Sequence, residues 1–436
     1  MIIVRFDRGS VVVEGGEGIL GSSVFPAYRY GDVLQRLRGA NADFRDEASE
    51  APPCPHLESS YDLRDYQFEA VEAWARVGCK GIIVLPTGAG KTVVAIKAAE
   101  RLQASTLIVV PTLVLVEQWR ETLQRAFKIP VGSLGGGSED IRPVTVSTYD
   151  SAALRAGSLG NRFSLIIFDE VHHLPAQMNR RIATAYIAPY RLGLTATLGE
   201  DDEALGYLVD LVGKVVYEKT VDELAGRHLS GYTVRTVQLP LTSEEKAEYE
   251  SQYSIYRDFL RRRGLKIRSP MDYLRFVRSS GVDPEARRAL LARNTAMDIA
   301  LNSGAKIQYL SRLLESNPAS KTIIFTRHNK LVYRISRDLL IPSITHQTGR
   351  REREDILSRF RDGTYRRIVT SQVLDEGVDV PDASVAVILS GTGSSREFIQ
   401  RLGRILRRRE GKEAVLFELV SQDTAETRMS RRRKGD

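Results

Sequence analysis

Short runs of apolar, β-branched residues alternate with helical stretches along most of the chain, and this alternation constrains the fold most strongly. In the first half such runs occupy residues 81–85, 106–110, 144–147, 165–168 and 191–194. In the second half they return at residues 322–325, 343–345, 367–370, 385–389 and 414–419. Continuous apolar strands joined by helices form parallel sheets that are covered on both faces. The sequence therefore predicts an α/β fold with two parallel-sheet lobes.

Two other regions interrupt this pattern. The first 50 residues hold short alternating runs and several glycines, which indicates a small β-rich unit with an added helix, and a proline-rich linker follows at residues 52–55. Between residues 240 and 300 strands disappear, and Tyr249, Tyr253 and Tyr256 recur at helical spacing. Residues 255–293 carry 11 Lys or Arg against 4 Asp or Glu. We expect a basic helical insert between the lobes.

The amino-acid composition limits which partners and which cellular compartment we expect for the protein. The 436 residues have a net charge of +8, which favours polyanionic partners. The two cysteines, Cys54 and Cys79, can form neither a disulfide framework nor a four-ligand zinc site. No apolar run approaches the roughly 18 residues that a membrane span needs. We expect a reduced, cytoplasmic protein without a membrane partner, and its compact size favours a prokaryotic source.

A glycine-rich loop follows the first strand of the first lobe and precedes a helix. Its residues are Leu85, Pro86, Thr87, Gly88, Ala89, Gly90, Lys91 and Thr92. Glycines let backbone N–H groups close around a phosphate, and the helix N-terminus favours an anion. Lys91 would reach the β- and γ-phosphates of ATP, and the Thr92 hydroxyl would bind Mg²⁺. The strict pattern begins with Gly where this chain has Leu85; a flexible turn is the alternative interpretation.

Two carboxylates follow the strand at residues 165–168, 78 residues after Lys91. At the carboxyl end of a buried strand, Asp169 would hold Mg²⁺ and Glu170 would deprotonate the attacking water. The alternative is a solvated acidic turn, and for His172 we expect a hydrogen-bonding role. Gln67, ahead of the loop, could pair with the adenine edge through its amide.

An arginine pair in the second lobe completes the candidate catalytic set. Arg404 and Arg407 lie three residues apart after Gln400, hence on one helical face. Arginine carries a permanent positive charge that can stabilise a phosphoryl group during its transfer. If these arginines reach the phosphoryl group from a second lobe, hydrolysis depends on closure of the two lobes. Composition alone favours a solvated basic helix face instead.

Taken together, these segments resemble the ordered motifs of superfamily 2 nucleic-acid helicases. The matching segments are residues 63–67, 86–92, 169–172, 194–197, 323–327, 372–381 and 400–407. Residues 145–151, 167–173, 324–329 and 371–377 further resemble the XPB branch in its compact archaeal form. This resemblance implies two RecA-like lobes, a DNA-damage-recognition-like head and a helical thumb. We expect the boundaries 1–55 (head), 56–240 (ATP-binding lobe), 241–300 (thumb) and 301–436 (second lobe).

The resemblance also assigns roles to single residues. Arg64, Glu376, Gly377 and Asp379 would help to bind nucleotide, and His172, Thr195 and Thr197 would couple hydrolysis to movement. The implied phosphate contacts to DNA are Pro111, Thr112, Thr148, Thr326, Arg327, Thr370 and Ser371. The charge excess of the insert independently predicts DNA contacts at Arg261, Arg262, Arg263 and Lys266; an exposed face packed by aromatics is the alternative.

One departure from the family concerns strand opening. The family carries an Arg-Glu-Asp triplet where this chain has Glu200, Asp201 and Asp202, and carboxylates repel phosphates. The resemblance implies an ATP- and Mg²⁺-dependent DNA helicase or translocase of 3′-to-5′ polarity in nucleotide excision repair, with a repair nuclease as partner. A link to transcription is a further expectation. An RNA helicase and an ATP-gated clamp that loads a partner onto DNA are the alternatives.

Overall fold

The computed structural model describes residues 1–199, 201–371, 383–390 and 413–434. The chain divides into two compact units, Met1–Leu224 and Ala225–Asp436. The described strands form one small sheet and two large ones. Both large sheets are built from parallel neighbours apart from one short hairpin, so the predicted α/β class with two parallel-sheet lobes is confirmed.

A small sheet forms the head of the first unit, with strand order β3-β2-β1-β4. Alternate residues Val4, Val11 and Val13 are fully buried against Leu37 of helix α2, which is how a half-buried sheet of this size gains a core. Gly9 approaches residue 185 so closely that an added Cβ would lie 2.8 Å from the Ala185 Cβ. The elements are β1 (Ile2–Asp7), β2 (Ser10–Glu14), α1 (Glu17–Leu20), β3 (Val24–Pro26), η1 (Ala27–Arg29), α2 (Tyr30–Gly39) and β4 (Phe44–Asp46).

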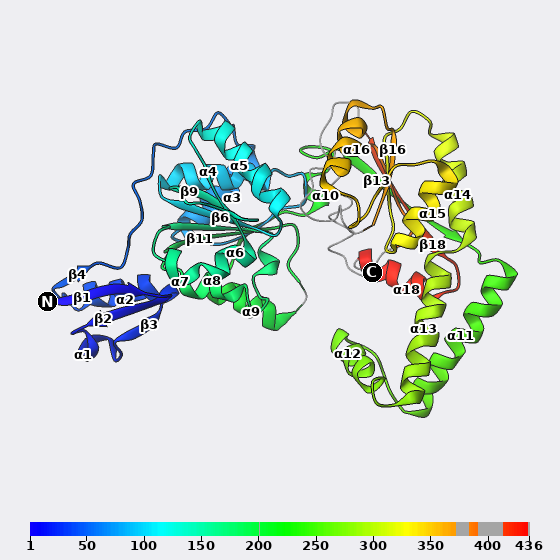
Figure 1. The fold of residues 1–436 in the computed structure, drawn as a ribbon, viewed down its shortest axis with the longest axis horizontal. Coiled ribbons are helices and arrows are strands. Elements are labelled where there is room, and N and C mark those ends of the chain that lie inside the picture. The colour runs from blue at the N-terminus through cyan, green and yellow to red at the C-terminus, as the bar shows by residue number, and fades with distance from the viewer. Residues whose placement is uncertain (200, 372–382, 391–412, 435–436) are drawn as a thin grey trace. The chain divides into compact units, whose positions relative to one another are not determined.

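The first large sheet has strand order β12-β5-β11-β10-β6-β9-β7-β8. Helices α3, α4 and α5 cover one face and α6 to α9 the other (Figure 1). Its strands are β5 (Lys80–Val84), β6 (Thr106–Val110), β7 (Gly132–Gly135), β8 (Ser138–Asp140), β9 (Val144–Thr148), β10 (Leu165–Asp169), β11 (Tyr190–Thr195) and β12 (Val215–Glu218). Its helices are α3 (Asp65–Arg76), α4 (Lys91–Leu102), α5 (Leu113–Phe127), α6 (Tyr149–Leu154), α7 (Ala156–Leu159), η2 (Val171–His173), α8 (Arg180–Ala185), α9 (Asp202–Leu211) and α10 (Val221–Leu224).

The second large sheet has strand order β13-β18-β17-β14-β16-β15. Strand β13 pairs with β18 along all nine of its residues. Residues 225–240 therefore belong to the second unit, and the expected lobe boundary at residue 240 is wrong. The strands are β13 (Gly231–Leu239), β14 (Thr322–Phe325), β15 (Ser343–Ile344), β16 (Arg367–Thr370), β17 (Val385–Ile388) and β18 (Glu413–Ser421). The helices beside them are α14 (Gly304–Ser316), α15 (Asn329–Leu339), α16 (Arg350–Asp362) and α18 (Ala425–Lys434).

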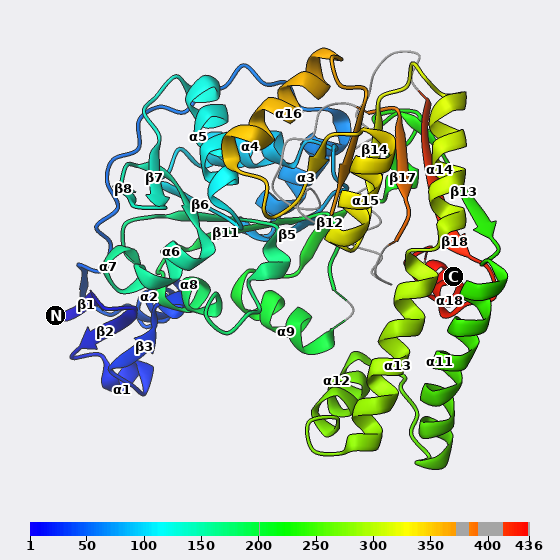
Figure 2. The ribbon, with the colours of Figure 1, turned by 45° about the vertical axis from the view of Figure 1, so that its right-hand side comes forward.

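Three helices project from this second sheet (Figure 2): α11 (Ser243–Arg262), α12 (Pro270–Ser279) and α13 (Pro284–Leu301). Tyr249, Tyr256 and Phe259 are buried on α11, so the tyrosine spacing marks an inward helical face. Each helix begins at a capping side chain, Thr242, Ser269 or Asp283. No helix in the described part of the chain is both long and apolar enough to cross a membrane.

Candidate active site

The glycine-rich loop leaves the end of β5 and enters α4 at Lys91. Gly88 and Gly90 have φ values of 87° and 80°, a conformation that side chains disfavour. At Gly90 a Cβ would also meet the Gln67 Nε2 at 2.5 Å. The sequence therefore needs glycine here for two reasons, and the loop presents backbone and a helix N-terminus as an anion site does.

Two side chains of α3 brace this loop. The Tyr66 hydroxyl and the Gln67 amide both donate to the carbonyl oxygen of Ala89, at 2.6 and 2.9 Å. The Gln67 Oε1 accepts from the backbone N–H of Arg64 at 3.0 Å, and the Arg64 guanidinium lies 3.4 Å from the Tyr66 hydroxyl. Gln67 is 3% exposed. Both ends of its amide are engaged within the protein, an arrangement that differs from the adenine pairing expected from the sequence.

The two carboxylates lie at the carboxyl end of β10. Sequence reasoning missed Trp119 of α5, whose indole donates to the Asp169 Oδ2 at 2.9 Å, while the Glu170 backbone N–H donates to the Oδ1 at 3.1 Å. Burial raises the pKa of Asp169 to about 6, the Glu170 charge adds to this rise, and Lys91 and Trp119 oppose it. Asp169 thus keeps an incompletely compensated charge at the sheet edge.

Glu170 connects the loop to the neighbouring strand. Its carboxylate lies 3.5 Å from the Lys91 ammonium and 3.5 Å from the His172 Nδ1. The Thr195 hydroxyl oxygen lies 3.4 Å from this carboxylate. Thr195 is within reach because β11 ends there and lies between β5 and β10. The Glu170 side chain is 15% exposed, so one charged group both contacts three partners and meets solvent.

A short hydrogen-bonded path leaves this carboxylate. The His172 Nδ1 and the Thr195 hydroxyl lie 3.1 Å apart. The Thr195 hydroxyl donates to the Thr197 carbonyl at 2.8 Å, and the Thr197 N–H lies 3.3 Å from the same hydroxyl oxygen. The structure thus brings together the residues that the sequence placed in separate motifs, and movement of residues 195–197 can reach Glu170 through hydrogen bonds.

The donor set suits Mg²⁺ better than a transition metal. Asp169 offers a buried carboxylate, and Thr92 stands in the first turn of α4. Among the described residues no group of three or more His, Cys, Asp or Glu could hold a metal. Mg²⁺ is typically bound by one or two protein oxygens together with substrate phosphates and water. Asp169 and Thr92 are therefore the residues that could hold it.

The expected DNA contacts of the first unit lie at two adjacent strand ends. Pro111 and Thr112 follow β6, Thr148 ends β9, and Val110 and Thr148 are register partners. The hydroxyls of Thr112 and Thr148 cap the next helices by accepting from Leu115 and Ser151 backbone N–H groups. These residues share one edge of the sheet.

In the second unit the expected contacts differ in accessibility. Thr326 and Thr370 are 0% exposed, and their hydroxyls donate to the backbone carbonyls of His328 and Ser371. Ser371 is also buried. Arg327 is exposed, so its side chain is the group here that solvent and ligands can reach.

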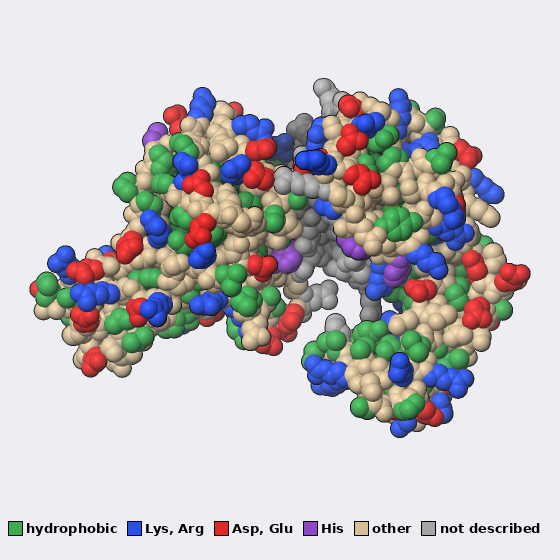
Figure 3. Space-filling model, in the orientation of Figure 1, with side chains coloured by type: hydrophobic (Ala, Val, Ile, Leu, Met, Phe, Trp, Pro, Cys, Tyr) green, Lys and Arg blue, Asp and Glu red, His purple; other side chains and the backbone are tan. Residues whose placement is uncertain are grey.

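The basic insert displays its arginines at its surface. Figure 3 shows Lys and Arg side chains beside hydrophobic ones on these helices. Arg261, Arg262 and Arg263 are 78, 65 and 51% exposed, and lie 3.2 to 3.7 Å from acidic partners. Lys266 is exposed as well. Exposed pairs of this kind are weak and can exchange partners.

Some expected site residues lie outside the described part of the chain. These are Glu200, Glu376, Gly377, Asp379, Gln400, Arg404 and Arg407.

Comparisons with known proteins find two matching family models and a similar solved structure. Residues 60–200 match the family described as "Type III restriction enzyme, res subunit", and residues 305–409 match "Helicase conserved C-terminal domain". The Hef helicase domain of Pyrococcus furiosus, a crystal structure, is similar with a TM-score of 0.58 and 22% identity, over 84% of this chain and 97% of that one. That likeness shows the fold.

Two sequence relatives extend the match. The DNA 3'-5' helicase XPB of Mycobacterium tuberculosis is 30% identical over 400 residues, which cover 88% of this chain and 65% of the relative. The DNA 3'-5' translocase XPB2 of Sulfurisphaera tokodaii is 44% identical over 440 residues, which cover 100% of both chains. This full-length similarity shows that the chain belongs to the XPB family.

Proposed function

We propose that this protein is an ATP-dependent DNA translocase or helicase that moves 3′ to 5′ and acts in nucleotide excision repair. The observation that carries the proposal is the cluster of Lys91, Glu170, His172 and Thr195 at one sheet edge. The names of the relatives, which include a general transcription and DNA repair factor IIH subunit of Saccharomyces cerevisiae, support DNA as the substrate.

In the proposed reaction the loop and Lys91 bind the phosphates of ATP. Lys91 now lies 3.5 Å from Glu170, so a phosphate that draws the ammonium away frees this carboxylate. Glu170 then accepts the proton of the attacking water as general base. Asp169 and Thr92 would hold Mg²⁺, which would supply charge compensation for the phosphates. Thr195 and Thr197 transmit the changed contacts of Glu170 along their hydrogen bonds.

Other assignments belong to the same proposal. Gln400, Arg404 and Arg407 act in hydrolysis from the second lobe, and the two arginines supply the counter-charge. Glu376, Gly377 and Asp379 help to bind nucleotide. The head at residues 1–55 serves as a DNA-damage-recognition-like domain, the insert acts as a thumb, and a repair nuclease is the partner protein.

Steady-state ATP hydrolysis with different nucleic acids tests the proposal. The purified chain is assayed without nucleic acid, then with single-stranded DNA, duplex DNA, forked DNA and RNA. Strong stimulation by DNA but not by RNA supports the proposal, and displacement of a triplex-forming strand from the duplex then reports translocation. Stimulation by RNA alone favours the RNA helicase. DNA stimulation without displacement favours the ATP-gated clamp, and no stimulation contradicts the proposal.

A further inference from the structure

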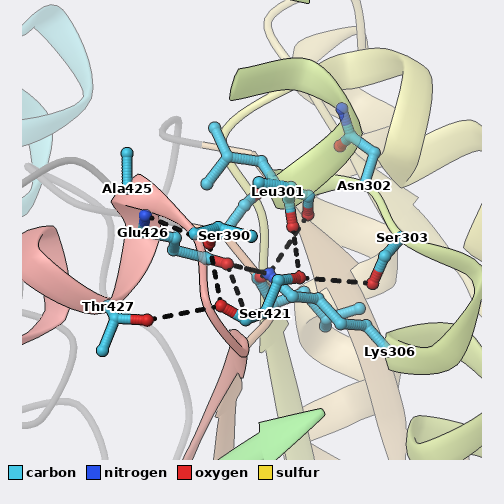
Figure 4. Close-up of polar contacts among 12 residues, drawn as sticks. Leu301, Asn302, Ser303, Lys306, Ser390, Ser421, Ala425, Glu426 and Thr427 are labelled. Atoms are coloured by element: carbon cyan, nitrogen blue, oxygen red, sulfur yellow. Dashed lines mark hydrogen bonds and ion pairs between the residues drawn. The ribbon is translucent and has the colours of Figure 1, made fainter. Parts of the chain in front are cut away.

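A buried ion pair joins helices α14 and α18 in the second unit (Figure 4). The Lys306 ammonium donates to both carboxylate oxygens of Glu426, at 2.7 and 2.8 Å. The two side chains are 0% and 1% exposed. The desolvation of such a pair offsets most of its attraction, and hydrophobic residues of similar size often stabilise a core equally well. The pair is therefore better explained by the geometry it imposes than by added stability.

On one side the ammonium holds the end of strand β17. It donates to the Leu389 carbonyl at 2.8 Å. The Leu389 backbone N–H donates to the Phe325 carbonyl at 3.0 Å, and the Ser390 hydroxyl oxygen accepts from the Arg327 backbone N–H at 2.8 Å. Lys306 thus fixes the strand end that in turn fixes the loop bearing Arg327.

On the other side the network reaches the base of the helical insert. The Ser421 backbone N–H donates to the Glu426 carboxylate at 2.8 Å, and its hydroxyl donates to the Ala300 carbonyl of α13 at 2.6 Å. The Tyr249 hydroxyl of α11 accepts from the Ala425 backbone N–H at 2.8 Å. Both long helices of the insert are therefore hydrogen-bonded to residues 421–426.

A second contact links the same two parts. The His328 Nε2, next to Arg327, lies 3.6 Å from the Asp298 carboxylate of α13. The Arg327 loop and the insert base are thus joined through the buried network and also lie next to each other at this more exposed contact.

From this geometry we infer that Lys306 is a positioning residue, which keeps the insert base and the Arg327 loop in one fixed relation. The inference rests on the proposed function, in which both surfaces contact DNA. A duplex held by the insert then also engages the loop. Without the connection, DNA can bind the insert without engaging the loop, so DNA stimulation of ATP hydrolysis falls. We expect basal hydrolysis to be kept, since neither Lys306 nor Glu426 is among the residues proposed to bind ATP or to act in its hydrolysis.

The test compares single and paired replacements in the full-length chain. Lys306→Met and Glu426→Leu each leave a buried charge unpaired and lower the Tm sharply, whereas the double variant removes both charges and recovers most of it. We expect the double variant to keep basal ATP hydrolysis. We expect its stimulation by duplex DNA to fall by about fivefold or more, a typical coupling between sites, with a higher half-saturating DNA concentration. A purely structural pair instead predicts wild-type stimulation once the Tm is restored, and that result overturns the inference.

A matched control and a milder variant complete the design. The exposed pair of Arg359 and Asp355 on α16 serves as control, and Arg359→Met with Asp355→Asn should leave stimulation unchanged. If the double variant at the buried pair does not fold, Tyr249→Phe with Ser421→Ala decides the question. This variant keeps the pair and removes two links to the insert, and we expect stimulation to fall by about twofold. Unchanged stimulation overturns the inference. A wild-type protein that DNA does not stimulate contradicts the proposed function itself.

Discussion

The two lobes each bury a cation, and they compensate its charge differently. Among the described residues, the Lys or Arg side chains at 0% exposure are Arg191 in the first unit and Lys306 in the second. Lys306 faces a carboxylate. Arg191 instead donates to four backbone carbonyls, those of Ala183, Tyr186, Ala188 and Leu211.

The difference follows from the shape of the two cations. The planar guanidinium has five N–H donors that point in different directions, so it can reach several carbonyls at once. Ala183 and Leu211 lie toward the C-terminal ends of α8 and α9, where the helix dipole carries its partial negative charge. Burial still lowers the pKa of Arg191 to about 10, so the guanidinium keeps its charge at neutral pH. The compact ammonium of Lys306 instead pairs with a carboxylate, that of Glu426.

The position of each cation relative to its sheet is also informative. Arg191 lies at the amino end of β11, paired with Lys80 at the start of β5. Lys306 contacts Leu389, just beyond the carboxyl end of β17. In open parallel sheets ligands bind at the carboxyl ends of the strands. We therefore expect Arg191 to maintain the fold, and we expect charges at the carboxyl edges to take part in the proposed reaction.

The largest expected effect comes from the carboxyl edge of the first lobe. Glu170→Gln removes the proposed general base, and we expect DNA-stimulated turnover to fall by about 10² to 10⁴-fold. The free energy of unfolding should change little. Phosphate release at saturating DNA and urea denaturation measure the two quantities. Glu100→Gln, at an ion pair on α4, is the control. Near-normal turnover in Glu170→Gln would place the base elsewhere.

The converse result is expected at the amino edge. Arg191→Met leaves four buried carbonyls without their donor, and each unsatisfied group costs about 1 to 3 kcal/mol. We expect the free energy of unfolding to drop by about 3 kcal/mol or more, while turnover per folded molecule is kept. Arg142→Met, at an exposed pair with Asp140, should change the unfolding free energy little. A loss of turnover without a loss of stability would break the comparison between the two edges.

A smaller effect distinguishes two roles of Gln67. If its amide braces the loop, Gln67→Leu weakens binding of ATP and GTP alike, by about tenfold for a loss of about 1.4 kcal/mol. If the amide reads adenine, ATP binding falls while GTP binding is unchanged. Equilibrium titrations with both nucleotides separate the outcomes, and a selective loss of ATP binding would contradict the bracing role.

The smallest expected effect concerns the exposed charges of the insert. Replacing Arg261, Arg262 and Arg263 by Ala should weaken DNA binding and lower the slope of log affinity against log salt by up to about 3. The control removes the same charge from α15 and α16 through Arg334→Ala, Arg337→Ala and Arg359→Ala. An unchanged slope in the insert variant favours the interpretation as a solvated face packed by aromatics.

Site residues were predictable from the sequence where residues close to them along the chain determine their position. The phosphate loop needs glycines at fixed spacing before Lys91. Asp169 and Glu170 directly follow an apolar strand, and because the carboxyl ends of parallel strands share one edge of the sheet, both carboxylates are expected near the loop. Burial of Tyr249 and Tyr256 likewise follows from helical spacing.

Other features depend on tertiary contacts that the sequence does not signal. Strand β13 pairs with β18, which lies about 180 residues further along the chain, and neither strand's sequence indicates this pairing. The link of Lys306 to Glu426 spans 120 residues. Thr326 and Thr370 are common polar residues, and their burial depends on how β14 and β16 pair.

Under the proposed function, in which the lobes move, strand β13 has a mechanical consequence. Tension carried along the backbone from the first unit enters the second at this edge strand, before it reaches α11. Nine consecutive register pairs with β18 share that load. A force on the segment that connects the two units therefore acts on the sheet, and it does not act directly on the helices of the insert.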